Sequence, residues 1–238
     1  MNSIETLQKW IDESKTIVFF LGAGVSTESG LKDFRSVDGL YHMNYTYPPE
    51  QILSHSFFLK HPDIFFDFYK KYLNALEIKP NLCHEYLVKL EKKGKLKAIV
   101  TQNIDGLHTK AGSSCVFELH GSIYRNYCIS CGKSYSASYV FSSSGIPRCS
   151  CGGIIKPDVV LYEEPLDDKV VRGAIQAIQE ADLFIVAGTS LTVYPAASFL
   201  HYFKGRHLVI INRDKISFDE QADLVLHESL GDVFAKLN

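Results

Sequence analysis

Four cysteines stand in two close pairs near the middle of the chain, with 17 residues between the pairs. The first pair has the spacing Cys-x-x-Cys and the second the tighter spacing Cys-x-Cys. Four thiolates at such separations can form the tetrahedral shell that a zinc ion prefers. A shell of four sulfur atoms leaves no position for water, so the expected zinc is structural. The predicted ligands are Cys128, Cys131, Cys149 and Cys151.

A second candidate site begins where an apolar run ends in Gly22-Ala23-Gly24, within TIVFFLGAGVSTESGLKDFRS (16–36). A glycine turn after a strand places backbone N–H groups at the start of a helix, where a pyrophosphate can approach closely. The usual dinucleotide fingerprint has a third glycine three residues after the second, and Thr27 stands there instead. A tight turn that binds no ligand therefore remains an alternative.

The loop that follows this turn is rich in polar residues. Residues 26–29 (STES) suit a loop lining better than a helix interior, because short hydroxyl side chains compete for backbone hydrogen bonds. Asp33, Phe34 and Arg35 come next. One interpretation is a loop that folds over a dinucleotide, with Arg35 on phosphate and Phe34 screening a reactive carbon. The other is a solvated loop whose Arg–Asp pair has little energetic consequence.

Amide and carboxylate side chains also follow the next apolar run, in TQNIDGLH (101–108). Because sites in open α/β sheets form at the carboxyl ends of strands, Gln102, Asn103 and Asp105 are expected in the same crevice as the glycine turn. A helix cap is the alternative, since Asn103 or Asp105 could satisfy unpaired backbone N–H groups. Three such groups within four residues exceed what one cap needs, which favours a functional interpretation.

Two further strand ends carry candidate residues. In FELHGS (117–122), His120 could act as a general base, because a neutral imidazole titrates near physiological pH; a purely structural histidine is the alternative. In GTSLTVYP (188–195), Gly188, Thr189 and Ser190 offer donors at a strand end. Asn212 is the candidate for holding an adenosine ribose, a role that an acidic residue often has at such a position.

The elements that position these residues alternate between strands and helices. Short apolar runs predict buried strands, and their near-continuous apolarity suits a parallel sheet covered on both faces. The predicted strands are 16–20, 97–101, 158–162, 182–188 and 207–212, and amphipathic helices are expected in 1–15, 84–94 and 167–180. This alternation predicts an α/β fold with a doubly wound, Rossmann-like parallel sheet.

Two segments interrupt the alternation and are expected to form a smaller module beside the main sheet. The first, 37–80, is rich in aromatic residues and contains a clear helical pattern at 65–77. The second, 122–155, holds the paired cysteines. The expected Rossmann-like domain then comprises 1–36, 81–121 and 156–238, and the small domain a helical insertion (37–80) and a zinc-binding insertion (122–155).

Composition sets limits on partners and location. The formal net charge of −2 gives no general attraction to nucleic acid or to an anionic membrane. The N-terminus mixes charged and apolar residues, unlike a signal peptide, and no run approaches the roughly 18 apolar residues of a membrane span. Cysteines in a metal pattern suit a reducing compartment. The sequence therefore predicts a cytoplasmic protein that binds neither membrane nor nucleic acid directly.

Taken together, these stretches resemble the sirtuins, a family of NAD-dependent protein deacylases, over roughly residues 15 to 235. The family's loop reads Gly-Ala-Gly-Ile-Ser-x-Glu-Ser-Gly-Ile-Pro-Asp-Phe-Arg, and GAGVSTESGLKDFR follows it closely. TQNIDGLH, LHGS, the four cysteines, PDVVLYEE and GTSLTVYPAA follow in the family's order. Such a series is far more specific than any single motif, and the short chain looks most like a bacterial-type member.

The resemblance implies a set of roles for individual residues. His120 is the implied proton acceptor, and Asn103 would order a ribose hydroxyl or a water. Ile104 and Asp105 would hold the nicotinamide carboxamide. The other implied contacts to NAD are Gly22, Ala23, Gly24, Thr27, Phe34, Arg35, Gln102, Gly188, Thr189, Ser190, Asn212 and Asp232. An extended acyl-lysine peptide would pair with Val159, Val160, Leu161 and Tyr162 on one side and with Leu191, Val193 and Tyr194 on the other.

The activity implied by the resemblance is NAD-dependent protein lysine deacetylation. The acyl group moves from lysine to ADP-ribose, with release of nicotinamide and 2′-O-acyl-ADP-ribose. Cleaving the nicotinamide–ribose bond builds positive charge on the sugar, so positioning and electrostatic preorganisation must do most of the work. His120 then deprotonates a ribose hydroxyl. A loop that closes over a consumed co-substrate explains the crowded segment after the glycine turn.

The chain departs from the family pattern in places. Lys32 replaces the usual proline, and Tyr162 and Glu163 stand where Phe-Gly is usual. We hypothesise that Glu163 and Glu164 favour basic residues that flank the acyl-lysine. Succinyl-preferring sirtuins carry Tyr-x-x-Arg in the helical insertion, whereas FYKKYL has no arginine at that position, so acetyl or a longer apolar acyl group is expected.

Two other functions remain open at the level of sequence. Transfer of ADP-ribose to a protein would use the same NAD site and differ mainly in the acceptor. A non-enzymatic module could instead sense a nucleotide and contact nucleic acid through the zinc ribbon. Lys133 and Arg148 are the only cations close to the cysteine pairs, which is too sparse for tracking phosphates.

Overall fold

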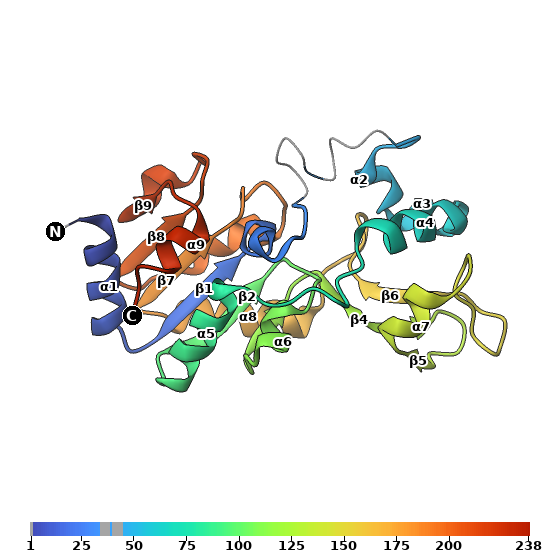
Figure 1. Cartoon of the computed structure of the whole chain (residues 1–238), viewed down its shortest axis with the longest axis horizontal. Helices are drawn as coiled ribbons and strands as arrows, with labels where there is room; N and C mark the ends of the chain where they lie inside the picture. Colours follow the sequence, from blue (N-terminus) through green and yellow to red (C-terminus); the bar gives the residue numbers. More distant parts are fainter. Residues whose placement is uncertain (1, 34–38, 40–44) are drawn as a thin grey trace.

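A six-stranded sheet dominates the computed structural model, which describes residues 2–33, 39 and 45–238 (Figure 1). Its neighbouring strands are all parallel, in the order β3-β2-β1-β7-β8-β9. The strands are β1 (Ile17–Leu21), β2 (Leu96–Thr101), β3 (Val116–Glu118), β7 (Leu183–Ala187), β8 (His207–Ile211) and β9 (Leu224–Leu226). The order reverses between β1 and β7, and ligands of such sheets bind at the carboxyl ends of the strands near that reversal.

Both faces of this sheet are covered, which explains its apolar strands. All five residues of β1 and of β7 are buried. One face packs against α1 (Ser3–Glu13), α5 (Leu82–Lys92) and α9 (Leu230–Phe234). The other face packs against α8 (Asp168–Glu180) and the 3₁₀ helix η4 (Ala196–Tyr202).

Side-chain caps set where the helices begin. Asn2 and Glu5 form a capping box at the start of α1, and Asp167 accepts two backbone N–H groups at the start of α8. Asn81 caps α5 and also donates from Nδ2 to the backbone oxygen of Val25 at 2.8 Å. The cap of α5 therefore also holds the turn that follows β1.

A smaller antiparallel sheet, in the order β5-β4-β6, lies at the end of the molecule away from the two termini (Figure 1). Its elements are β4 (Gly121–Cys128), β5 (Ser134–Tyr135), β6 (Ile155–Val159) and the neighbouring α7 (Ala137–Ser142). The helices α2 (Pro49–Ile52), α3 (His55–Lys60) and α4 (Pro62–Tyr72) share one apolar cluster with it. Phe58, Phe65 and Tyr69 are fully buried in that cluster.

The prediction of a parallel-sheet strand at 158–162 is wrong. Those residues begin in β6, which pairs antiparallel with β4 in the small sheet, and after Val159 the chain leaves the sheet. Beyond that point Tyr162 forms an isolated bridge with Ser54. A short apolar run shows that a strand is buried but not which sheet it joins.

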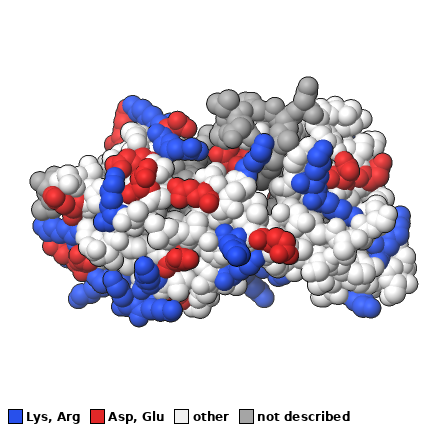
Figure 2. Space-filling model, viewed as in Figure 1, with Lys and Arg blue, Asp and Glu red and all other residues white. Residues whose placement is uncertain are grey.

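Other elements differ from the predictions in their bounds or were not predicted. The helix expected at 65–77 is α4, which begins earlier, at Pro62, and ends at Tyr72. The short elements β3, β9 and α9 were not predicted, nor were α6 (Leu107–Ala111) and η5 (Asp219–Gln221). Within the described ranges, no helix combines the length and the apolarity needed to cross a bilayer. Basic and acidic side chains are interspersed over the face drawn in Figure 2.

Candidate active site

A cavity of about 490 Å³ opens at the carboxyl ends of β1, β2, β7 and β8, beside the point where the strand order reverses. It brings together candidate residues that lie far apart in the sequence. The candidate residues that line it are Gly22, Ala23, Gly24, Thr27, Gln102, Asn103, Ile104, His120, Val159, Val160, Leu161, Tyr162, Gly188, Thr189, Ser190, Val193, Tyr194 and Asn212.

The turn at Gly22–Gly24 and the turn at Gly188 approach each other so closely that side chains do not fit between them. The backbone N–H of Gly24 donates to the oxygen of Gly188 at 2.9 Å. A Cβ atom on Gly24 would lie 2.8 Å from the Cα atom of Gly188, whose own φ of +62° is in the left-handed region. The turn leads into two short 3₁₀ helices, η1 (Ala23–Val25) and η2 (Thr27–Ser29), and not into an α-helix.

Behind this turn lies a small buried polar network. Ser26 Oγ donates to Asp105 Oδ2 at 2.7 Å, and Asn103 Nδ2 donates to Ser26 Oγ at 3.1 Å. Burial raises the pKa of Asp105, and hydrogen bonds from Leu107 N–H and from these side chains oppose that rise. Because Leu107 begins α6, Asp105 also has the capping contact that was its alternative interpretation. Asp105 itself does not line the cavity, whereas Asn103 does.

His120 lies between β3 and β4 with its ring held in one orientation. Its Nδ1 atom is 2.8 Å from the backbone oxygen of Gln102. A carbonyl oxygen only accepts, so Nδ1 carries the proton and Nε2 is the free acceptor. Burial lowers the pKa of His120, and the bond to Gln102 opposes that shift. The imidazole is therefore neutral at neutral pH and can accept a proton.

The opposite wall of the cavity is held by reciprocal hydrogen bonds. The N–H of Thr189 donates to Asn212 Oδ1, and Asn212 Nδ2 donates to the backbone oxygen of Thr189, both at 2.9 Å. Gln102 Nε2 donates to Thr189 Oγ1 at 2.9 Å. These bonds join the ends of β2, β7 and β8 into one rigid rim.

The candidate peptide-binding segment, Val159–Tyr162, is fastened at both ends. The N–H of Val160 donates to the backbone oxygen of His120 at 2.9 Å. At the other end, Tyr162 N–H donates to the oxygen of Leu53, and His55 N–H donates to the oxygen of Tyr162, both at 3.0 Å. The segment thus connects the candidate base with α3.

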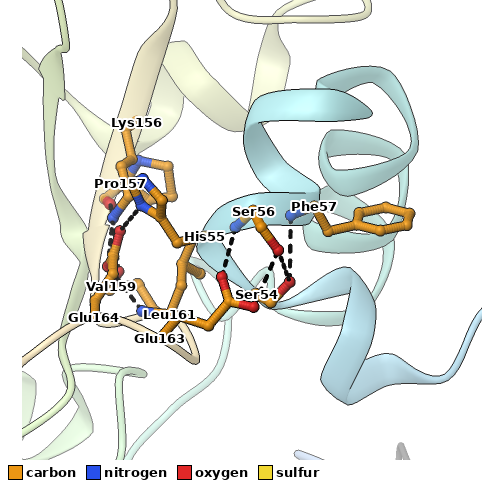
Figure 3. Close-up of polar contacts among 10 residues, drawn as sticks. All are labelled: Ser54, His55, Ser56, Phe57, Lys156, Pro157, Val159, Leu161, Glu163 and Glu164. Carbon is orange, nitrogen blue, oxygen red and sulfur yellow. Dashed lines mark hydrogen bonds and ion pairs between the residues drawn. The ribbon is translucent and has the colours of Figure 1, made fainter.

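The acidic residues that follow this segment have partners within the protein (Figure 3). Glu163 accepts from the backbone N–H and the hydroxyl of Ser56 at 2.8 and 3.0 Å. Glu164 accepts from Lys156 Nζ at 3.1 Å and from the N–H of Leu161 at 2.9 Å, and it pairs with His55 Nδ1 at 2.7 Å. Both carboxylates are therefore engaged, which weakens the hypothesis that they select basic flanking residues in a peptide.

Some candidates are not part of the cavity wall. Leu191 is buried and has a φ of +53°, but it does not line the cavity. Asp232 lies in α9, where its carboxylate accepts from Ser229 Oγ at 2.8 Å, and it does not line the cavity either. Phe34 and Arg35, which were predicted to contact NAD, lie outside the described residues.

The cavity also has lining residues that were not among the predicted site residues. Leu53 and Leu73 come from the helical insertion, and Glu28 and Asp33 from the loop after the glycine turn. The lining also includes Leu166, Pro195, Arg213, Asp214, Lys215, Ile216, Glu228, Ser229 and Leu230. Most of these residues stand in loops without a recognisable motif. The one available signal was their position directly after strands that already carried candidates.

The four candidate zinc ligands come together at the far end of β4. Their sulfur atoms all lie within 4.8 Å of one another. Cys128 Sγ is 3.5 Å from Cys151 Sγ, and Cys131 Sγ is 3.6 Å from Cys149 Sγ. Sulfur atoms about 2.3 Å from a central tetrahedral zinc lie roughly 3.8 Å apart, so the donor set fits the metal. Four thiolates complete the shell, as expected of a structural site.

Comparisons with known proteins agree with this geometry. The Sir2 family profile matches residues 22–195. An NAD-dependent protein deacetylase of Clostridium perfringens (strain 13 / Type A) is 56% identical, over 99% of this chain and 98% of that protein. An NAD-dependent protein deacetylase of Staphylococcus aureus (strain N315) is 44% identical, also over 99% and 98%.

Solved structures with the same fold carry ligands. A Sir2 structure with a deacetylated p53 peptide and 3′-O-acetyl ADP-ribose has a TM-score of 0.92 at 37% identity, over 99% of this chain and 97% of that one. A Sir2 structure with a p53 peptide and NAD+ has a TM-score of 0.87 at 38% identity, with the same coverage. This chain belongs to the Sir2 family, the sirtuins.

Proposed function

We propose that this chain is an NAD-dependent protein-lysine deacetylase with NAD as co-substrate. One observation carries the proposal: the glycine turn, the rim around Thr189 and Asn212, and the segment Val159–Tyr162 all border the cavity that His120 lines. A nucleotide and an extended peptide can therefore reach the same imidazole. Relatives named NAD-dependent protein deacetylase, at 44–56% identity over nearly the whole chain, support the same activity.

The cavity wall has the features that a dinucleotide needs. The close approach of Gly24 to Gly188 leaves backbone groups free of side chains, which suits a pyrophosphate. Gln102, Thr189 and Asn212 form a hydrogen-bonded rim for the adenosine ribose. When bound, NAD supplies a nicotinamide–ribose bond whose cleavage leaves an electrophilic sugar carbon.

His120 is the proposed base. Its Nε2 atom takes up a proton from a sugar hydroxyl, while Nδ1 keeps its own proton on the oxygen of Gln102. The lowered pKa keeps the ring neutral before this step. Asn103 reaches the cavity from the end of β2, next to Gln102, and would orient a sugar hydroxyl or a water molecule. Asp105, fixed through Ser26, supports the position of Ile104 and the nicotinamide pocket.

The acyl-lysine side chain would enter beside apolar residues. Leu53, Leu73 and Ile104 line the cavity together with Val159 and Leu161. An apolar wall favours an acetyl group or a longer apolar acyl group over a charged succinyl group. The peptide backbone would lie along Val159–Tyr162 on one side and Val193–Tyr194 on the other.

The division into domains follows the two sheets except at β6 (Ile155–Val159), which pairs with β4 in the small sheet although most of it stands in the segment 156–238. We place the Rossmann-like domain at 1–36, 81–121 and 156–238, and the small domain at 37–80 and 122–155. The apolar cluster shared by α2, α3, α4 and the antiparallel sheet supports grouping 37–80 with 122–155, and it also includes Val159 and Leu161. The thiolates of a zinc site need a reducing environment, which favours the cytoplasm.

The decisive assay measures nicotinamide release from NAD, with and without an acetyl-lysine peptide. We expect release to depend on the peptide, and His120→Ala to lower turnover by about a hundredfold or more. Mass spectrometry of the peptide should show loss of the acetyl group. A gain in mass equal to ADP-ribose, with the acetyl group retained, would establish the transferase alternative instead.

A further inference from the structure

Glu163 combines a left-handed backbone conformation with a long side chain at a position where the sirtuin pattern has glycine. Its φ is +76°, a region that glycine enters freely and that residues with a Cβ atom rarely adopt. The sirtuin pattern has glycine at this position, so the glutamate is a departure of this chain. Strained backbone of this kind persists only where surrounding contacts hold it.

Both carboxylate hydrogen bonds of Glu163 are made with one residue of the helical insertion, Ser56. Its two carboxylate oxygens accept from the backbone N–H and the hydroxyl of Ser56 (Figure 3). Directly before it, Tyr162 exchanges two backbone hydrogen bonds with Leu53 and His55. Four hydrogen bonds therefore join residues 162–163 to residues 53–56.

This junction lies next to the place where the peptide is expected. Glu163 and Leu53 both line the cavity. Three residues before Glu163, the N–H of Val160 donates to the backbone oxygen of His120. Any movement of the segment away from α3 therefore also changes its position relative to the imidazole.

We propose that Glu163 is a positioning residue for the acyl-lysine peptide. By binding Ser56, it fixes the segment Val159–Tyr162 against α3 before the peptide arrives, so that less order has to be created on binding. This inference rests on the proposed function. It assigns Glu163 no contact with the reacting atoms, and it accounts for both carboxylate contacts of an otherwise exposed side chain.

The test compares steady-state kinetics of the wild type with Glu163→Gly and Glu163→Gln, using an acetyl-lysine peptide with alanines on both sides. Glycine relaxes the backbone but removes the carboxylate, and we expect the KM for the peptide to rise about fivefold. We expect kcat and the KM for NAD to change by less than about twofold, because the proposed role gives Glu163 no contact with NAD or with the reacting atoms. Glutamine keeps an acceptor for Ser56 and should restore most of the peptide affinity.

Two further variants separate this role from a general structural effect. Ser56→Ala added to Glu163→Gly should raise the KM for the peptide by less than about twofold more, because both changes remove the same contact. Glu77→Gly removes an exposed glutamate from a turn outside the cavity and should leave all constants unchanged. Hydrogen exchange at the Ser56 amide should become faster in Glu163→Gly, which reports the contact without turnover.

An unchanged peptide KM in Glu163→Gly, with an active wild type, overturns the inference and leaves the proposed function standing. A parallel loss of kcat, NAD affinity and Tm also overturns it, since that pattern shows a purely structural role. A wild type that releases no nicotinamide with the acetyl-lysine peptide removes the proposed function, and the inference with it.

Discussion

His120 Nδ1 donates to the backbone oxygen of Gln102 over 2.8 Å, and this bond links the chain before β4 to the end of β2. The acceptor belongs to the main chain, so no side-chain substitution at position 102 removes it. The side chain of Gln102 points to a different partner, Thr189 Oγ1. One residue thus orients the base with its backbone and braces the nucleotide rim with its side chain.

The pH dependence of turnover should reflect the burial of His120. The base works when neutral, and burial lowers its pKa from the ordinary value of 6.5. Activity should therefore persist below pH 6.5 and fall only as the pH drops through the lowered value. A profile of kcat/KM from about pH 5 to about pH 8 measures this midpoint. Gln102→Ala should keep the midpoint, and a wild-type midpoint above 6.5 would contradict the assignment.

Gly24→Ala should weaken NAD binding at the turn. The new Cβ atom would lie 2.8 Å from the Cα atom of Gly188. This atom belongs to the backbone and cannot easily move away. We expect the KM for NAD to rise more than about tenfold and unfolding to become easier by about 1–3 kcal/mol. The control is Gly94→Ala, where φ is +69° but no atom lies within 4 Å. That variant should lose some stability and keep its NAD affinity.

Two buried histidines should make the protein sensitive to mild acid. His84 and His108 are 0% and 2% exposed, with ring centroids 4.7 Å apart. Burial lowers the pKa of His84 to about 4, and burial together with His84 holds that of His108 well below 6.5. Below pH 6.5 the unfolded chain binds protons that the folded chain does not. The free energy of unfolding should then fall by about 1.4 kcal/mol per pH unit for each of these histidines, and His120, whose pKa burial also lowers, adds to the fall.

Urea denaturation at several pH values between 6.5 and about 5 measures that slope. The carboxyl groups of Glu164 and Asp167 have lowered pKa values and affect stability only below about pH 4.5, outside this window. His108→Gln should reduce the slope even if it also lowers the absolute stability. A flat profile in the wild type would contradict the prediction.

Removing the metal should unfold the small sheet. Cys149→Ser deletes one of four sulfur ligands, and a chelator should have the same effect on the wild type. Apparent binding energies of structural zinc are about 10 kcal/mol, so a fall in Tm of about 10 °C or more is expected. Cys115→Ser is the matched control, because Cys115 is exposed and outside the cluster. Equal Tm values for both variants would argue against a metal site.

Lys156 should matter far more for stability than a typical surface lysine. Its side chain is 7% exposed, and its Nζ atom donates to Glu164 Oε2 and to the backbone oxygens of Pro157 and Val159. Lys156→Ala removes the buried cation that pairs with Glu164 and the donor to both backbone oxygens, and we expect a loss of about 3 kcal/mol. Lys236→Ala breaks an exposed pair with Glu228 and should leave stability nearly unchanged. Urea denaturation of both variants makes the comparison.

The parallel sheet could be predicted because both of its faces are buried. Runs such as those of β1 and β7 have no polar face, so their apolarity alone identified them. The same signal failed at 158–162, where the apolar run is buried against the helical insertion instead. A buried segment has an apolar sequence whichever element covers it, and that sequence does not show which strand it pairs with.

The predicted part of the site came from strand ends with recognisable motifs, and the missing parts stand in loops without a motif or in the helical insertion. Gln102, Thr189 and Asn212 were found because each follows an apolar run. Leu53 and Leu73 reach the cavity from the helical insertion, and only the tertiary fold brings them there. Glu163 was noticed as a departure, but its contact with Ser56 depends on a backbone conformation that the sequence does not reveal.

The strand order has a consequence for how this protein is made. β1 lies in the middle of the large sheet, between β2 and β7. At the edge of that contact, Thr16 N–H donates to a carboxylate of Asp182, 166 positions later in the chain. A ribosome must therefore deliver most of the polypeptide before its first strand has both neighbours. Until then β1 has an open edge, so folding of the nascent protein should be slow and aided by chaperones.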